Sequence, residues 1–171
     1  RCGAQAWGDA MLFPEEHELI DRIALALIQR KERMGTAESC TGGLIAAALT
    51  HFPGSSDVVS GGLVTYSNTM KESVLSVTDR TLQSEGAVSQ ATAIEMSMGA
   101  LSMAPDAKLA VAVTGIAGPD GGTVDKPVGT VCLARQLGDG APYVETCHFP
   151  GDRAAIRTAT VRRALELLLE A

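Results

Sequence analysis

A carboxylate, a hydroxyl and a thiol follow one another in the segment Ala37-Glu38-Ser39-Cys40-Thr41-Gly42-Gly43. Serine and cysteine side chains attack carbonyl carbons when a neighbouring base activates them. The alternative is structural, because small polar residues often cap the first turn of a helix. The segment by itself favours the cap, so evidence for catalysis has to come from the rest of the chain.

The elements on both sides place this segment at a junction between a strand and a helix. Apolar residues recur at helical spacing over 19–28, an extended stretch covers 34–37, and an alanine-rich run over 44–50 ends before Pro53-Gly54. The first turn of a helix exposes N–H groups without internal partners, which favour an anion or a developing oxyanion. Gly42 and Gly43 leave room for a ligand to approach the main chain.

A lysine stands five residues beyond a tyrosine in Thr65-Tyr66-Ser67-Asn68-Thr69-Met70-Lys71. We expect a buried strand over 58–66 before it and a short helix over 70–77, so Lys71 is expected near the carboxyl edge of a sheet. A surface lysine is normally solvated. A desolvated lysine loses its proton more readily and can then accept the proton of a serine hydroxyl.

Two further segments are polar or rich in glycine. Five of the nine residues from Thr114 to Gly122 are Gly or Pro, directly after an apolar strand expected over 108–114. This density exceeds what a hairpin needs and suggests a loop shaped around a ligand. Gly54-Ser55-Ser56 reads equally well as an ordinary loop or as part of a site.

The remaining pattern alternates strands and helices. Strands are expected over 128–135 and 142–149, a helix opens at Ser89 with Ala91, Ile94, Met98 and Leu101 as its buried face, and a helix covers 153–170. The prediction is an α/β fold: a single three-layer-like domain, its central mainly β-sheet covered by helices. The strand order does not follow from the sequence. Residues 1–10 read as a tag remnant or disordered extension, and 11–171 as the domain.

Composition limits the possible functions. The chain has 171 residues, enough for one sizeable core, and a net charge of −6, which argues against nucleic-acid binding. Its four cysteines are scattered, and we find neither a secretory signal nor an apolar run long enough to span a membrane. We therefore expect a cytoplasmic protein with reduced thiols and no membrane partner. Apolar helix faces in so small a domain predict a homo-oligomer.

The motifs together resemble the C-terminal domain of the competence/damage-inducible protein CinA, whose stand-alone members are nicotinamide mononucleotide deamidases. The matching motifs follow one another along the chain in the order of the family: 36–43, 54–56, 64–68 with Lys71, 86–89, 114–122 with 126–130, and 151–153. Several long motifs in a fixed order are specific, whereas each alone would be weak.

The resemblance implies hydrolysis of the carboxamide of nicotinamide mononucleotide to nicotinic acid mononucleotide and ammonia, without a metal or another cofactor. It implies Ser39 as the nucleophile, Lys71 as the base and Tyr66 as a helper. The residues expected around the pyridine mononucleotide are Ser56, Thr114, Gly115 and Arg153. We also expect Thr41, Gly42 and Gly43 there, with the N–H groups of residues 40–43 holding the oxyanion.

Three alternatives stay open at this point. Arg153 is expected to bind the substrate phosphate, but a structural ion pair with Asp152 or another acid is an equal possibility. Cys40 is a rival nucleophile, since thiolates near helix N-termini act in other amidases. A rival of another class is a nucleotide-binding or regulatory module that keeps the pocket without chemistry.

Overall fold

The computed structural model describes residues 15–171, so the predictions for residues 1–10 and for a start at residue 11 lie outside the described part. The strands are β1 (Met34–Glu38), β2 (Val59–Val64), β3 (Leu109–Gly115), β4 (Thr130–Leu137) and β5 (Tyr143–His148). The helices are α1 (His17–Arg30), α2 (Leu44–Leu49), α3 (Asn68–Leu75), α4 (Asp79–Ser84), α5 (Gln90–Met103) and α6 (Arg153–Leu169), with a 3₁₀ turn at Ser55–Asp57.

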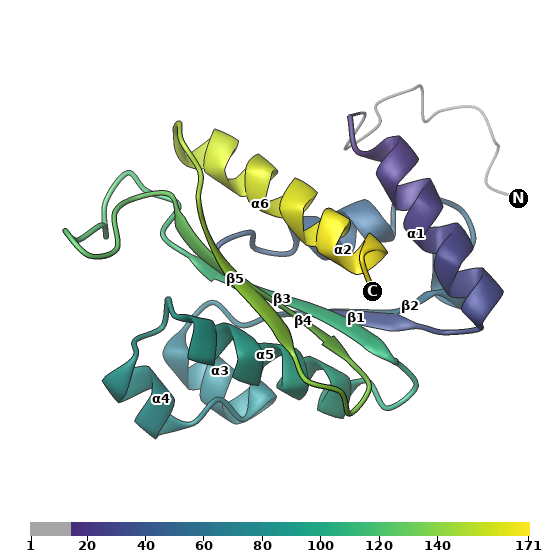
Figure 1. Cartoon of the computed structure of the whole chain (residues 1–171), viewed down its shortest axis with the longest axis horizontal. Coiled ribbons are helices and arrows are strands. Elements are labelled where there is room, and N and C mark those ends of the chain that lie inside the picture. The colour runs from purple at the N-terminus through teal and green to yellow at the C-terminus, as the bar shows by residue number, and fades with distance from the viewer. Residues whose placement is uncertain (1–14) are drawn as a thin grey trace, which may run out of the picture.

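The strands form one mixed sheet in the order β2-β1-β3-β4-β5. β1 is parallel to both β2 and β3, whereas β4 runs antiparallel to β3 and β5. Helices α1, α2 and α6 cover one face of the sheet, and α3, α4 and α5 lie on the other (Figure 1). The predicted α/β fold with a central sheet between helical layers is confirmed.

Strand β3 holds the two halves of the core together because both its faces are buried. Leu109, Val111 and Val113 pack with α1 and α6, while Ala110 and Ala112 pack against α3 and α5 on the other face. This alternation follows from the two-residue period of a strand. The small side chains on the second face allow α5 to lie close to the sheet.

Two predictions about individual elements are wrong. The strand predicted over 58–66 is shorter and lies at an edge of the sheet, where Val64 is 45% exposed, rather than being buried. On α5, the predicted buried face is wrong because Met98 is 53% exposed, while Ala93, Met96 and Ala100 face the core. Apolar periodicity cannot distinguish these faces, since the residues at both are apolar.

Small residues bring α5 against α3. A Cβ built on Gly99 would lie 2.2 Å from the carbonyl oxygen of Leu75 and 2.7 Å from its Cα. These are backbone atoms at the end of α3, so they cannot move aside as a side chain can. Gly99 therefore sets the spacing between the two helices.

No helix in residues 15–171 is both long enough and apolar enough to cross a membrane.

Candidate active site

Ser39 lies directly after β1, at the edge where the parallel strands β1 and β3 both end. Its N–H donates to the carbonyl oxygen of Val113 at 3.1 Å, and the next residue of β3 is Thr114. The predicted strand-to-helix junction is confirmed, with α2 beginning at Leu44. The register of the two strands thus places Ser39 and Thr114 at one edge of the sheet.

Glu38, the last residue of β1, is fully buried and takes the place of an external anion at the start of α2. Its carboxylate accepts from the N–H groups of Gly43 (3.0 Å), Ile45 (3.1 Å) and Ala46 (2.8 Å). The hydroxyls of Thr41 and Thr36 also donate to it, at 2.7 and 3.3 Å. The carboxylate thus provides acceptors for N–H groups in the first turn of α2 that have no partner within the helix.

This arrangement corrects the expected oxyanion cradle. The Gly43 N–H donates to Glu38, the Gly42 N–H donates to the carbonyl oxygen of Ser39 at 3.1 Å, and the Thr41 hydroxyl donates to Glu38. Thr41, Gly42 and Gly43 do not line the cavity at Ser39, although Gly43, with φ of 97°, shapes the turn. Within residues 15–171, the Cys40 and Thr41 N–H groups have no oxygen acceptor and lie near the Cys40 sulfur.

Lys71 reaches Ser39 from α3, on the opposite face of the sheet from α2. The Ser67 hydroxyl caps this helix by accepting from the Met70 N–H at 3.2 Å, so Lys71 lies in its first turn. The Lys71 Nζ lies 3.2 Å from the Ser39 Oγ, 3.0 Å from the Thr65 carbonyl oxygen and 3.5 Å from that of Tyr66.

Burial lowers the pKa of Lys71 below its usual value of 10.5, because the charged ammonium loses its hydration. The side chain is 2% exposed and forms no ion pair with an acid in the described part of the chain. A neutral amine can donate to the two carbonyls and still accept the proton of the Ser39 hydroxyl with its lone pair. Lys71 is therefore not a solvated surface lysine.

Cys40 lies beside Ser39 but is poorly suited to be a nucleophile. It is 5% exposed, and burial raises the pKa of its thiol to about 11, with a smaller contribution from the charge of Glu38. The attacking species of a cysteine enzyme is the thiolate, which this environment disfavours.

A cavity of about 230 Å³ opens over Ser39 and Lys71. Larger hollows of about 470 and 490 Å³ lie elsewhere on the described surface, but neither contains a serine next to a buried lysine. The structure brings six of the predicted site residues together in the smaller cavity, which is lined by Ser39, Cys40, Tyr66, Asn68, Lys71, Ala87, Val88, Thr114, Gly115, Ala117 and Arg153.

Ser56 is the predicted site residue that the structure separates from the others. It is exposed in the 3₁₀ turn that precedes β2, whereas Ser39 follows the end of β1. Because β1 and β2 are parallel, these two positions lie at opposite edges of the sheet. Within one copy of the chain, Ser56 is thus not part of the cavity at Ser39.

Arg153 begins α6 at the rim of the cavity. Its guanidinium donates to the Tyr66 hydroxyl at 3.2 Å and to the Gly118 carbonyl oxygen of the glycine-rich loop at 2.8 Å. Asp152 does not pair with it but caps the helix, accepting from the Ala155 N–H at 2.9 Å. No ion pair joins Arg153 to a carboxylate within residues 15–171, so the alternative of a structural ion pair finds no support in that part of the chain.

Sequence reasoning missed three contributors. Asn68 lines the cavity, Glu38 fixes the start of α2, and Arg157 contacts the nucleophile turn from α6. Two signals were available: a single acid at the end of a short strand, and two arginines four residues apart, which share a helix face.

The fold and the site define an α/β domain that holds a serine against a buried lysine at the carboxyl edge of its sheet. The CinA C-terminal domain family matches residues 16–171, nearly the whole described part. This chain belongs to that family, which confirms the resemblance seen in the sequence motifs.

Relatives and solved structures agree with this assignment. CinA-like proteins of Mycobacterium marinum (strain ATCC BAA-535 / M) and Mycobacterium leprae (strain TN) are 46% and 44% identical, over 96% and 94% of this chain. The chain spans only 38% and 37% of their lengths. A competence/damage inducible protein from Agrobacterium tumefaciens, 48% identical, superposes with a TM-score of 0.87 over 90% of this chain and 94% of that one.

Proposed function

We propose that this domain hydrolyses the carboxamide of nicotinamide mononucleotide, with Ser39 as the nucleophile and Lys71 as the base. The observation that carries the proposal is the 3.2 Å contact between the Ser39 Oγ and the Nζ of a buried lysine without an acidic partner in the described residues. A structural lysine would be expected to have a carboxylate partner or solvent. The resemblance of the motifs supplies the substrate.

In the first half of the reaction, the Ser39 Oγ attacks the carboxamide carbon while neutral Lys71 takes the hydroxyl proton. The carbonyl oxygen becomes an oxyanion next to the N–H group of Cys40, which lines the cavity and has no oxygen acceptor within the described residues. When the tetrahedral intermediate collapses, the C–N bond breaks. The proton returns from Lys71 to the leaving nitrogen, which departs as ammonia and leaves an ester on Ser39.

In the second half, water attacks the ester carbon and Lys71 takes its proton. Collapse of the second intermediate breaks the bond to the Ser39 Oγ, which recovers a proton from Lys71. The products are nicotinic acid mononucleotide and the original enzyme. Lys71 thus gains and loses one proton in each half, which requires an amine whose pKa is lowered towards the working pH.

The remaining cavity residues suit a mononucleotide. The cavity volume of about 230 Å³ is below the usual size of pockets that enclose a drug-sized ligand. The pyridine ring of the nucleotide would therefore lie inside the cavity and its phosphate outside. Arg153 stands at the rim, and a guanidinium pairs with phosphate through two parallel hydrogen bonds. Tyr66, hydrogen-bonded to Arg153, contacts Lys71 through its carbonyl and so connects the two ends of the site.

The direct test is ammonia release from nicotinamide mononucleotide by the wild type and by Ser39→Ala, with exposed Ser84→Ala as the control. We expect turnover by Ser39→Ala to fall to below about one thousandth, because the nucleophile is lost, and turnover by Ser84→Ala to be unchanged. Full activity of Ser39→Ala would refute the mechanism. Binding of the nucleotide by the wild type without ammonia release would instead identify a binding module.

The predicted homo-oligomer and the cytoplasmic location stay predictions.

A further inference from the structure

We propose that Arg157 is a positioning residue that holds the nucleophile turn, residues 39–43, through the carbonyl oxygen of Thr41. The inference deepens the proposed function and rests on it for its kinetic consequence. Its structural consequence can be measured without any substrate.

Arg157 reaches the nucleophile turn from α6. Its Nη2 donates to the Thr41 carbonyl oxygen at 2.9 Å and lies 3.6 Å from where a Cβ on Gly42 would be. The two residues are far apart in the sequence, so this contact ties α6 to the turn that follows β1. Arg153, one helical turn earlier, binds Tyr66 and the glycine-rich loop. The first two turns of α6 thus contact both sides of the proposed site.

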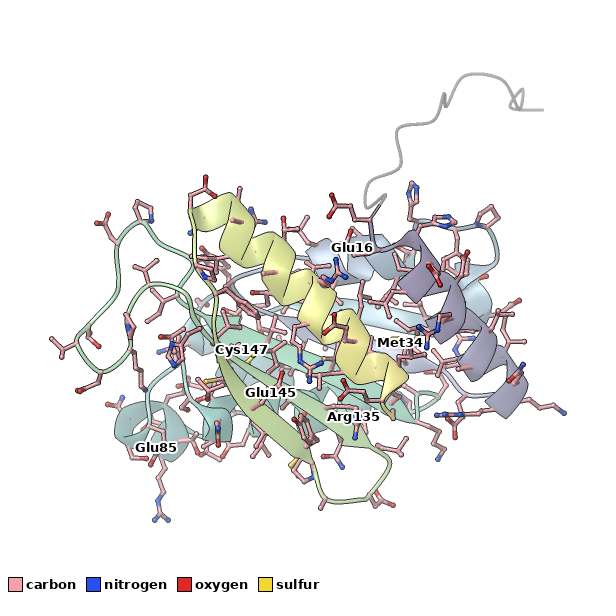
Figure 2. The ribbon with its side chains drawn as sticks, turned by 45° about the horizontal axis from the view of Figure 1, so that its top comes forward. Glu16, Met34, Glu85, Arg135, Glu145 and Cys147 are labelled. Atoms are coloured by element: carbon pink, nitrogen blue, oxygen red, sulfur yellow. The ribbon has the colours of Figure 1, made fainter. Side chains whose placement is uncertain are left out.

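The surroundings of Arg157 distinguish it from the arginines further along the same helix. Its buried Nε has no hydrogen-bond partner within the described residues. Arg163, by contrast, pairs with Glu145, Glu166 and Glu170, and Glu145 lies on β5 next to α6 (Figure 2). Because partly burying a guanidinium without a carboxylate is costly, stability alone does not explain Arg157.

Thr41 is held from two directions. Its hydroxyl donates to the buried Glu38, and its carbonyl oxygen accepts from Arg157. Fixing the side chain and the carbonyl oxygen of Thr41 fixes the peptide between Thr41 and Gly42, two residues after the proposed nucleophile Ser39. Cys40 lies in the same turn and is 5% exposed. Loss of Arg157 is therefore expected to loosen this turn while leaving the core intact.

The first test measures the alkylation of individual cysteines by iodoacetamide in the native protein, mapped by peptide mass spectrometry. In Arg157→Met we expect Cys40 to react about tenfold faster, the change expected from loss of one charge-assisted hydrogen bond. Cys132 and Cys147 serve as internal references and keep their rates. Arg157→Lys, which retains the charge, gives an intermediate rate, and the exposed Arg162→Met matches the wild type.

Two results of this labelling would overturn the inference. One is an unchanged Cys40 rate in Arg157→Met, and the other is faster labelling of Cys40, Cys132 and Cys147 together, which reports general destabilisation. Loss of the Arg157 charge by itself raises the pKa of the Cys40 thiol and slows its reaction. A faster reaction therefore reports opening of the turn and not a more reactive thiol.

The second test compares kcat and KM for nicotinamide mononucleotide. Misplacement of the nucleophile turn is expected to lower the kcat of Arg157→Met about tenfold or more while KM stays within about twofold. A raised KM with an unchanged kcat would show that Arg157 binds substrate instead, and would overturn the inference. If the wild type releases no ammonia, the proposed function fails, whereas the labelling result still decides the role of Arg157.

Discussion

Two buried charged residues flank Ser39, and they have opposite surroundings. Glu38 precedes Ser39 in the chain, and its carboxylate accepts five hydrogen bonds from the residues around it. Lys71 approaches from α3, and its amine faces a hydroxyl and two carbonyls without an acidic partner in the described residues. Hydrogen bonds fix the first group in place, whereas burial disfavours the charged form of the second.

This difference separates a structural role from a chemical one. A carboxylate that accepts five hydrogen bonds is held in one position, so it fixes the turn that carries the nucleophile. A lysine deprived of water and of counter-ions gives up its proton more easily, which is what a base requires. Burial alone does not identify a catalytic residue. The partners that compensate the charge decide between the two roles.

Replacing Lys71 tests the chemical side of this comparison and has the largest expected effect. Lys71→Met should lower kcat for ammonia release by about 10³-fold, the usual contribution of a general base, while its free energy of unfolding at neutral pH rises because a desolvated amine is removed. Kinetics and urea denaturation measure the two quantities, with the exposed Lys108→Met as the control. Lower stability together with retained turnover would reverse the assignment.

Glu38→Gln tests the structural side. Glutamine brings its own N–H donors towards the N–H groups of Gly43, Ile45 and Ala46, so some of these groups lose their acceptor. We expect a loss of about 3 kcal/mol in the free energy of unfolding, with turnover reduced in the fraction that folds. Urea denaturation followed by circular dichroism provides the value. A variant as stable as the wild type would mean that Glu38 is not the anchor of α2.

The pH dependence joins the two sides. Lys71 has a folded pKa below 10.5 and an unfolded pKa near 10.5. Between these values the unfolded chain binds a proton that the folded chain does not, so the contribution of Lys71 to stability increases with pH. By contrast, kcat/KM should rise as the pH passes through the folded pKa of Lys71, where the amine becomes neutral, and level off above that pKa. The free energy of unfolding of the wild type and of Lys71→Met, which lacks this group, is measured as a function of pH. If the difference between the two proteins does not change with pH, the pKa of Lys71 is not lowered.

Cys40→Ala is expected to have the smallest effect. The thiol is buried and its pKa is raised to about 11, so it supplies neither thiolate nor proton at neutral pH. Turnover should stay within about threefold of the wild type, since small changes in a buried side chain shift neighbours only slightly. An ammonia-release assay decides this. Loss of activity comparable to that of Ser39→Ala would restore the thiol as a candidate nucleophile.

The sequence predicted well whatever local pattern determines. Helical spacing, breakers and capping serines located the strands and helices to within a few residues, and the order of motifs indicated the family. Contacts between segments far apart in the sequence were harder to predict. Ser56 sits in a motif like those of the site, yet parallel pairing of β1 and β2 puts it at the other edge of the sheet. The role of Glu38 depends on where α2 turns back, and a linear pattern does not show this.

The close approach at Gly99 extends the active site beyond the residues that touch it. Leu75, whose backbone meets Gly99, lies one helical turn after Lys71 on the same helix. A side chain at position 99 would push that helix away, and the base would retreat from the hydroxyl with it. In a survey of random substitutions scored by growth or turnover, position 99 should therefore appear as intolerant as a catalytic position. Selection at position 99 is thus expected to preserve the distance between α3 and α5 rather than a functional group.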